Sequence, residues 1–206
     1  MAQEYPGSCQ LCGDEMARSK MNGHVAVCGP KHDKGSRSDA LVQLHVEAEE
    51  APEYWLFVEG REDASLQQLD SLLRRVWLEC CGHMSAFRVG RTEISKRSTL
   101  GSLSRRGPAF QYDYDFGSTT TLRAKVLGLR EGSLGRHVLR VLARNAPPKL
   151  ECADCGASAT LICPFCLDSG PCLFCRVHAR EHPCASEDAF MPTVNSPRMG
   201  VCGYTG

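Results

Sequence analysis

The amino-acid sequence has no net charge, no long apolar run and few aromatic residues. Its 206 residues carry 24 basic and 24 acidic side chains, so no global field would draw the molecule onto nucleic acid or an anionic membrane. No segment approaches the roughly 18 apolar residues that a membrane helix requires, and the N-terminus lacks the apolar run and cleavage pattern of a secretory signal. We therefore expect a cytoplasmic protein without a membrane segment.

Cysteine, in contrast, is abundant. The sequence contains 13 cysteines, mostly in Cys-x2-Cys pairs. A reducing compartment disfavours disulfides, and such pairs are typical zinc ligands. Hydrophobic residues make up 42% of the chain, which is enough for one core domain with smaller appendages. The composition therefore predicts a globular core accompanied by metal-binding modules.

Shifts in composition divide the chain. Residues 29–39 are rich in Gly, Ser and charge, and Pro147 with Pro148 marks a second boundary. The expected parts are a Cys-Cys-His-Cys zinc finger at 1–30, an α+β domain at 40–145, a two-zinc cross-brace-like module at 150–190 and an irregular tail at 191–206. For the central domain we expect a small mixed sheet with one principal helix.

Hydrophobic periodicity predicts the elements of the central domain. Apolar residues recur at spacings of three and four from Leu66 to Cys80, and Ser65 with Gln68 supplies a capping box, so a helix is expected from Ser65. Period-two or β-rich patterns predict strands at 40–48, 53–59, 84–89, 110–116, 119–129 and 137–145. Asp113 and Asp115 alternate with aromatic residues, which predicts that both aspartates face solvent.

Three stretches of the central domain resemble the plasmid pRiA4b ORF-3-like family. They are SLQQLDSLLRRVWL from Ser65, HMSAF from His83 and FQYDYDFGSTTTLRAKVLG from Phe110. The resemblance covers residues 40–145 and implies an α+β fold with no settled biochemical activity. The family's association with plasmids and mobile elements hints at DNA. Common members read His-Leu-His-Glu-Phe where this chain reads HMSAF, so no chemistry of the second His or the Glu is carried over.

The first candidate metal site has the pattern Cys9-x2-Cys12-x11-His24-x3-Cys28. This spacing fits a small ββα finger in which Cys replaces the last His. His24 and Cys28 lie about one helical turn apart on the same face. We expect one zinc ion at this site. The pattern is a weak signal for DNA reading, because a single finger buries little nucleic-acid surface.

The second cluster offers nine candidate ligands for two zinc ions. They are Cys152, Cys155, Cys163, Cys166, Cys172, Cys175, His178, His182 and Cys184. Alternating pairs predict a cross-brace resembling fingers of the B-box kind, which serve as interaction modules. Zinc would replace the apolar core that so short a segment cannot form.

Two pairings of these ligands are open. In the first, Cys172 and Cys175 join Cys152 and Cys155, while His178 and His182 join Cys163 and Cys166, so that Cys184 is spare. In the second, Cys175 and His178 complete the site of Cys152 and Cys155, His182 and Cys184 complete the site of Cys163 and Cys166, and Cys172 is spare. We favour the second, because Pro183 turns the chain so that His182 and Cys184 can face one ion.

The pattern favours binding over catalysis. A full ligand set describes a closed structural site, whereas a catalytic zinc keeps an open position. The leading hypothesis is a zinc-stabilised adaptor with about three zinc ions. It would bind an unidentified protein or nucleic acid, the latter through the basic stretch 88–106, and no small-molecule substrate. The alternative is a metal- or thiol-dependent enzyme that uses Cys80 or Cys81 with His83. We otherwise expect Cys80 to be a buried structural thiol, and Cys202 has no assigned role.

Overall fold

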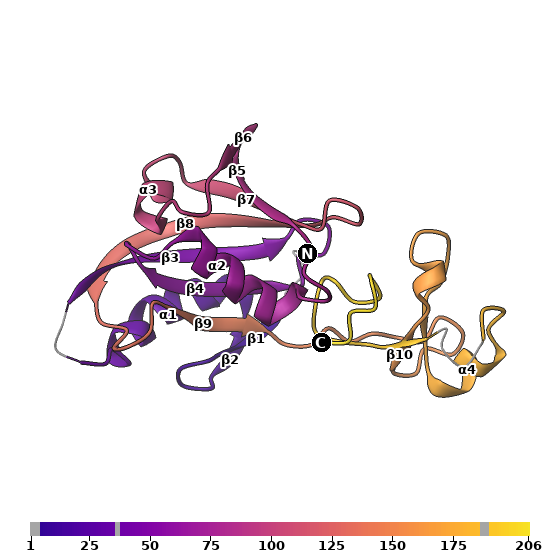
Figure 1. Ribbon diagram of the computed structural model, residues 1–206. Coiled ribbons are helices and arrows are strands. Elements are labelled where there is room, and N and C mark those ends of the chain that lie inside the picture. The colour runs from indigo at the N-terminus through magenta and orange to yellow at the C-terminus, as the bar shows by residue number, and fades with distance from the viewer. Residues whose placement is uncertain (1–4, 36–37, 186–189) are drawn as a thin grey trace. The chain divides into compact units, whose positions relative to one another are not determined.

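The computed structural model describes residues 5–35, 38–185 and 190–206 (Figure 1). The chain forms two compact units. The first, called here the sheet unit, comprises Met1–Arg75 and Met84–Ala146, and the second, called the C-terminal unit, comprises Val76–His83 and Pro147–Gly206. Among the described residues, no helix has the length and apolar character of a membrane span.

The sheet unit contains a nine-stranded sheet in the order β2-β1-β9-β4-β3-β8-β7-β5-β6 (Figure 1). Its strands are β1 (Pro6–Cys9), β2 (Glu15–Ala17), β3 (Asp39–Ala48), β4 (Trp55–Arg61), β5 (Ser85–Val89), β6 (Thr92–Ile94), β7 (Ala109–Tyr114), β8 (Thr120–Gly132) and β9 (Leu139–Asn145). All neighbouring strands pair antiparallel. The expected small mixed sheet is therefore wrong. Short hairpin connections such as β3 to β4 and β7 to β8 pair strands antiparallel, and the finger adds two more strands.

The N-terminal ββα segment belongs to this sheet. β1 pairs with β9, and helix α1 (Arg18–Lys31) packs on the same region. Met21 and Val25 of α1 are buried in one cluster with Trp55 and Leu142. A side chain at Gly7 of β1 would collide with the Trp55 ring, so only glycine permits this close approach. The finger and the central sheet consequently share one apolar core.

Helix α2 (Leu66–Leu73) begins as the sequence predicts. The Ser65 side chain accepts a hydrogen bond from the Gln68 backbone N–H, and the Gln68 side chain accepts one from the Ser65 backbone N–H. The helix continues as a π-helical segment, η1 (Arg74–Leu78), and ends before Cys80. Cys80 is half-buried and lies beyond the helix. The expected buried thiol is therefore wrong, because the helical repeat that placed Cys80 on the apolar face ends at Leu78.

The β7–β8 hairpin corrects the expectation for the two aspartates. Asp113 and Asp115 are each only 6% exposed. Asp113 accepts hydrogen bonds from Gln111 and Thr121 at 2.7 and 2.9 Å. Asp115 has a left-handed backbone with φ of 63° and accepts a hydrogen bond from the Gly117 N–H. Alternation alone predicted solvent on that face, but neighbouring polar groups cover these carboxylates.

The third helix of the sheet unit is short, and charges buried beside the sheet are paired. Helix α3 (Leu100–Ser104) begins at a Thr99 capping box. Glu59 of β4 is fully buried and accepts hydrogen bonds from Arg130 and Arg140. Asp33 contacts the same two arginines. Since buried charges are tolerated when they are paired and hydrogen-bonded, this group accounts for the charged interior at the α1 end of the sheet.

The C-terminal unit has little regular structure. Its elements are β10 (Leu161–Ile162), η2 (Pro164–Cys166), β11 (Leu173–Phe174), α4 (Arg176–Glu181) and β12 (Met191–Pro192). β10 pairs with β11 and β12 to form a small sheet. The segment 191–206, expected as an irregular tail, contributes β12 and buries Ser196, Arg198 and Tyr204. The unit therefore includes the end of the chain.

Candidate metal centres

Twelve of the thirteen cysteines lie in four groups, each of three cysteines and one histidine. The groups are Cys9, Cys12, His24 and Cys28; Cys80, Cys81, His83 and Cys202; Cys152, Cys155, Cys175 and His178; and Cys163, Cys166, His182 and Cys184. Within each group the ligand atoms lie within 4.8 Å of one another. All thirteen cysteines are free thiols. Each group could therefore hold a metal ion.

Zinc gives a geometric standard for these groups. Zinc lies about 2.3 Å from sulfur and about 2.0–2.1 Å from imidazole nitrogen, so a tetrahedral ion places two sulfurs about 3.8 Å apart and sulfur and nitrogen about 3.5 Å apart. A disulfide would instead require about 2.05 Å between sulfurs.

The N-terminal group joins the β1–β2 turn to α1. Cys9 Sγ lies 3.8 Å from Cys28 Sγ, and Cys12 Sγ lies 3.3 Å from His24 Nε2. Gly13 follows the knuckle with φ of 84°, which allows its N–H to bond to the Cys9 carbonyl at 2.9 Å. Burial, and then the neighbouring thiols of Cys12 and Cys9, raise the pKa of Cys28 to about 12. A divalent cation would reverse this effect, because it stabilises thiolates.

The group around Cys152 uses the start of α4. Cys152 Sγ lies 3.4 Å from His178 Nδ1, and Cys175 Sγ lies 4.0 Å from Cys155 Sγ. Burial would raise the pKa of Cys152, but backbone N–H donors of Cys175, Asp154 and Cys155 outweigh it, and together with His178 they lower the pKa to about 6. A thiol that is so easily deprotonated is suited to metal binding.

The group around Cys163 lies at the other end of α4. Cys166 Sγ lies 3.3 Å from His182 Nε2 and 3.9 Å from Cys184 Sγ. Cys163 is fully buried, and the His182 ring packs on Phe174 with centroids 4.5 Å apart. The imidazole is thereby held in place by an apolar contact.

The grouping in the C-terminal unit coincides with the second of the two pairings. Helix α4 ends at Glu181, and His182 has an extended backbone with ψ of 141°. His178 lies in α4 and His182 lies beyond its end, so the two histidines do not share a helical face and do not approach one ion together. Cys172 lies outside every group, and its carbonyl accepts a hydrogen bond from the Cys163 N–H. Occupation of these groups by metal stays a prediction.

Sequence reasoning placed Cys80, Cys81 and His83 near one another but missed Cys202, which lies more than a hundred residues later in the chain. Cys81 Sγ lies 3.0 Å from His83 Nε2 and 3.6 Å from Cys202 Sγ. One sequence feature could have indicated that Cys202 is a metal ligand: Cys81 and Cys202 are each followed by glycine, as the candidate ligands Cys12 and Cys155 are.

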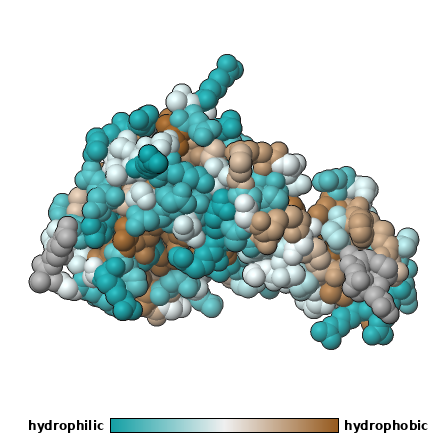
Figure 2. Space-filling view, viewed as in Figure 1, coloured by the Kyte–Doolittle hydropathy of each residue, from teal (hydrophilic) through white to brown (hydrophobic). Residues whose placement is uncertain are grey.

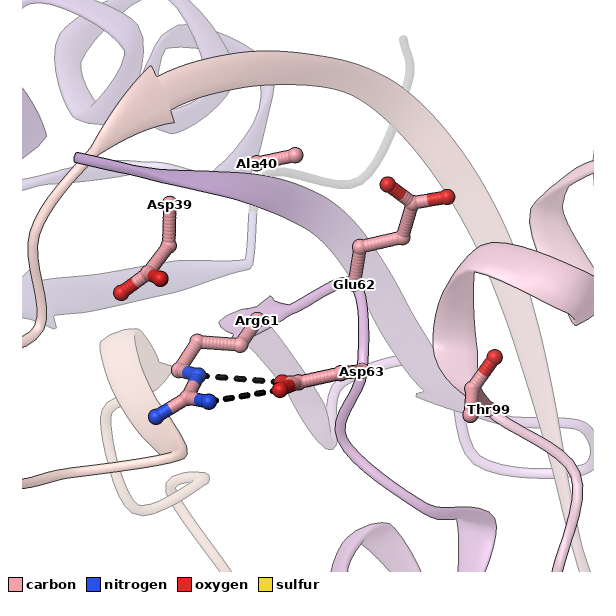
Figure 3. Close-up of a pocket in the computed structure, with 6 residues that line it drawn as sticks. All are labelled: Asp39, Ala40, Arg61, Glu62, Asp63 and Thr99. Carbon is pink, nitrogen blue, oxygen red and sulfur yellow. Dashed lines mark hydrogen bonds and ion pairs between the residues drawn. The ribbon is translucent and has the colours of Figure 1, made fainter.

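The sheet unit contains a pocket that is lined mostly by polar and charged side chains. It has a volume of about 360 Å³ and is lined by Asp39, Ala40, Arg61, Glu62, Asp63 and Thr99 (Figure 3). Arg61 faces Asp63 and donates to both of its carboxylate oxygens, at 3.0 and 2.6 Å. The Thr99 hydroxyl accepts the Ser102 N–H as the cap of α3. The polar groups are thus used in local structure.

A buried polar network in the same unit has a Ser–Lys contact. Asp70 accepts hydrogen bonds from Ser85, Lys96 and Tyr112, at 2.5, 3.0 and 2.8 Å, and from Arg74 at 2.9 Å. Lys96 also lies 2.6 Å from the Ser85 hydroxyl. Lys96 forms an ion pair with the Asp70 carboxylate, so the Ser85 contact is part of one hydrogen-bonded network around Asp70. We interpret the network as structural.

The class defined so far is an antiparallel sheet protein with Cys3His groups in both units. No family model matches the chain, and no curated protein matches it. A solved structure, that of a protein of unknown function from Methanosarcina mazei Go1, is 15% identical in sequence. The comparison covers 52% of this chain and 69% of that one, with a TM-score of 0.45.

Proposed function

We propose that this chain is a non-catalytic adaptor whose Cys3His groups are structural zinc sites and which binds another protein. The observation that carries this proposal is the completeness of the groups. Each of the three groups expected from the sequence supplies four soft ligands, which leaves no open position for a substrate or an activated water.

Charge pairing favours a protein over nucleic acid as the partner. In the basic stretch 88–106, Arg88 pairs with Asp113, Lys96 with Asp70, and Arg105 with Glu62. These cations are already neutralised within the unit, so fewer are left to displace counterions from phosphates. In the view of Figure 2, hydrophilic side chains cover most of the sheet unit and apolar ones form small separate patches.

The C-terminal unit offers apolar contact residues. Phe165 is 71% exposed and Val177 is 62% exposed, each within or beside a metal group. Aromatic side chains presented on a rigid support often dominate binding energy. We therefore assign the partner-binding role to this unit.

A cytoplasmic protein of the pRiA4b ORF-3-like kind, associated with plasmids or mobile elements, remains part of the proposal. The HMSAF stretch leads into β5, and the YDYDFG stretch forms β7 and its turn. The alternative function is a metal- or thiol-dependent enzyme, and the 3.0 Å contact between Cys81 Sγ and His83 Nε2 is the observation in its favour.

A capture experiment from the native cell tests the adaptor. The tagged full chain should retain a protein after nuclease treatment and in high salt, and Phe165→Ala should reduce the retained amount several-fold. Phe116→Ala is the matched control, because Phe116 is 50% exposed but lies in the sheet unit. Capture of material that disappears with nuclease would support nucleic acid instead. Equal loss in both variants would contradict the role of the C-terminal unit.

A further inference from the structure

The group of Cys80, Cys81, His83 and Cys202 lies entirely within the C-terminal unit. Cys81 Sγ is 3.9 Å from Cys80 Sγ and 3.6 Å from Cys202 Sγ. These separations match the roughly 3.8 Å between sulfurs on a tetrahedral zinc and are far beyond a disulfide bond. His83 Nε2 lies 3.0 and 3.1 Å from the sulfurs of Cys81 and Cys202. All four ligand atoms lie within 4.8 Å of one another.

The backbone around these cysteines repeats the knuckles of two of the other groups. Gly13 and Gly156 follow Cys12 and Cys155 with φ of 84° and 70°, and Gly82 and Gly203 follow Cys81 and Cys202 with φ of 84° and 68°. A left-handed glycine after a ligand cysteine turns the chain back around the ion. Four Cys-Gly steps of this kind are present among the described residues, and each lies in a Cys3His group.

Cys202 has a backbone conformation that needs support. Its φ is 50°, in the left-handed region that side chains other than glycine, asparagine and aspartate rarely adopt. Such conformations persist where the surroundings hold them, and they cluster at functional sites. A bond from Cys202 Sγ to a metal would supply that constraint.

The segments that carry the four ligands are already in contact. The Ser196 hydroxyl donates to the Trp77 carbonyl at 2.6 Å, and the Arg198 N–H donates to Ser196 Oγ at 2.9 Å. Gly82 donates its N–H to Glu79 Oε1 at 2.5 Å, which closes the turn that carries Cys81. The two segments that carry the ligands, 80–83 and the one around Cys202, are thus held near each other by hydrogen bonds of neighbouring residues.

We propose that Cys80, Cys81, His83 and Cys202 form a fourth zinc site, which fastens the end of the chain to the segment that follows η1. The full chain then binds four zinc ions. Cys81 and Cys202 are exposed, whereas the other three groups each contain at least one buried cysteine. Chelators reach exposed ligands more readily, so this ion leaves first.

Zinc content and thiol protection test the site in the full-length chain. Wild-type protein purified without chelator should contain four zinc ions. The variants Cys202→Ser and Cys81→Ser should each contain three zinc ions, and Cys172→Ser should contain four. Cys172→Ser is the matched control, because Cys172 belongs to no group. In native wild-type protein, iodoacetamide should leave Cys81 and Cys202 unmodified despite their exposure, and mild chelation should make them the first of the twelve grouped cysteines to react.

The second readout needs no variant and so remains decisive if a substitution prevents folding. Wild-type protein that contains three zinc ions and in which Cys81 and Cys202 are freely alkylated would overturn the fourth site and leave the three others intact. A disulfide between Cys81 and Cys202 in protein kept under reducing conditions would overturn it as well. If wild-type protein purified without chelator contained no zinc, both this site and the structural zinc sites of the proposed adaptor would be refuted.

Discussion

Cys12→Ser and Cys155→Ser should have different consequences for the sheet unit. Each residue is the exposed second cysteine of a Cys-x2-Cys-Gly knuckle, and each substitution exchanges one sulfur for oxygen. Both variants should lose one zinc ion. Only Cys12 belongs to the group that joins β1 and α1, whose apolar side chains pack with Trp55 and Leu142. We therefore expect only Cys12→Ser to destabilise the sheet unit.

The magnitude follows from the side chains that α1 buries. Met21 and Val25 are each at most 1% exposed. Burying such a side chain contributes about 1.5–3 kcal/mol, so release of α1 costs about 3–6 kcal/mol of unfolding free energy. With a shift of roughly 2–4 °C per kcal/mol for a unit of this size, the melting temperature of the sheet unit should fall by about 6–24 °C.

Hydrogen exchange with mass spectrometry, combined with calorimetry, separates the two units. In Cys12→Ser, amides of β9 and β4 should exchange faster, because β1 no longer covers the β9 edge. In Cys155→Ser, faster exchange should be confined to the C-terminal unit. If Cys12→Ser loses its zinc while the protection of β9 and the melting temperature stay as in wild type, zinc does not hold β1 and α1 on the sheet, and the expected coupling of this site to the sheet unit is refuted.

Three further outcomes are expected. Cys184→Ser should lose one zinc ion by mass spectrometry of the native protein while Cys172→Ser loses none, and the reverse would show that Cys184 is the spare ligand. Asp70→Asn should cost about 3–5 kcal/mol in denaturant unfolding because it breaks a buried ion pair, whereas Asp63→Asn, at a mostly exposed pair, should cost less than about 1 kcal/mol. Burial raises the pKa of Asp70, but hydrogen bonds from Ser85, Lys96 and Tyr112 outweigh it and lower that pKa. The contribution of Asp70 to the free energy of unfolding is therefore present above the unfolded pKa of about 3.9 and is lost as the pH falls below it. If the stability of Asp70→Asn fell with acid as steeply as that of wild type, this would be contradicted.

Local patterns in the sequence predicted local structure well. The capping box at Ser65, the strand β3 and the β7–β8 hairpin all follow from short-range periodicity or side-chain chemistry. Metal spacing likewise predicted which residues of the finger would converge, because the chain segment between a knuckle and its helix is short. These features depend on residues close together in the sequence.

Features that depend on distant segments were missed. The pairing of β1 with β9 joins residues more than 130 positions apart, which no periodicity indicates. The burial of Asp113 depends on Thr121 and Arg88 from two other strands. Cys202 meets Cys81 across 121 positions, so its grouping requires the tertiary structure of the C-terminal unit. In each case the missing information was a contact between segments far apart in the sequence, which neither periodicity nor composition indicates.

The two units differ in how much apolar core they contain, and most of the cysteines lie in the C-terminal unit, which has the smaller core. The sheet unit buries Trp55, Leu44 and Tyr112 together with paired charges, and its Cys3His group lies where the finger joins the sheet. The C-terminal unit has short strands and a buried cluster that itself contains Cys152 and Cys163. Structural zinc contributes on the order of 10–16 kcal/mol of apparent binding energy, which is folding energy where no site exists in the unfolded chain. With the proposed zinc ions bound, the metal ligands of that unit take the place of an apolar core, and an aromatic side chain such as Phe165 stays exposed at the surface.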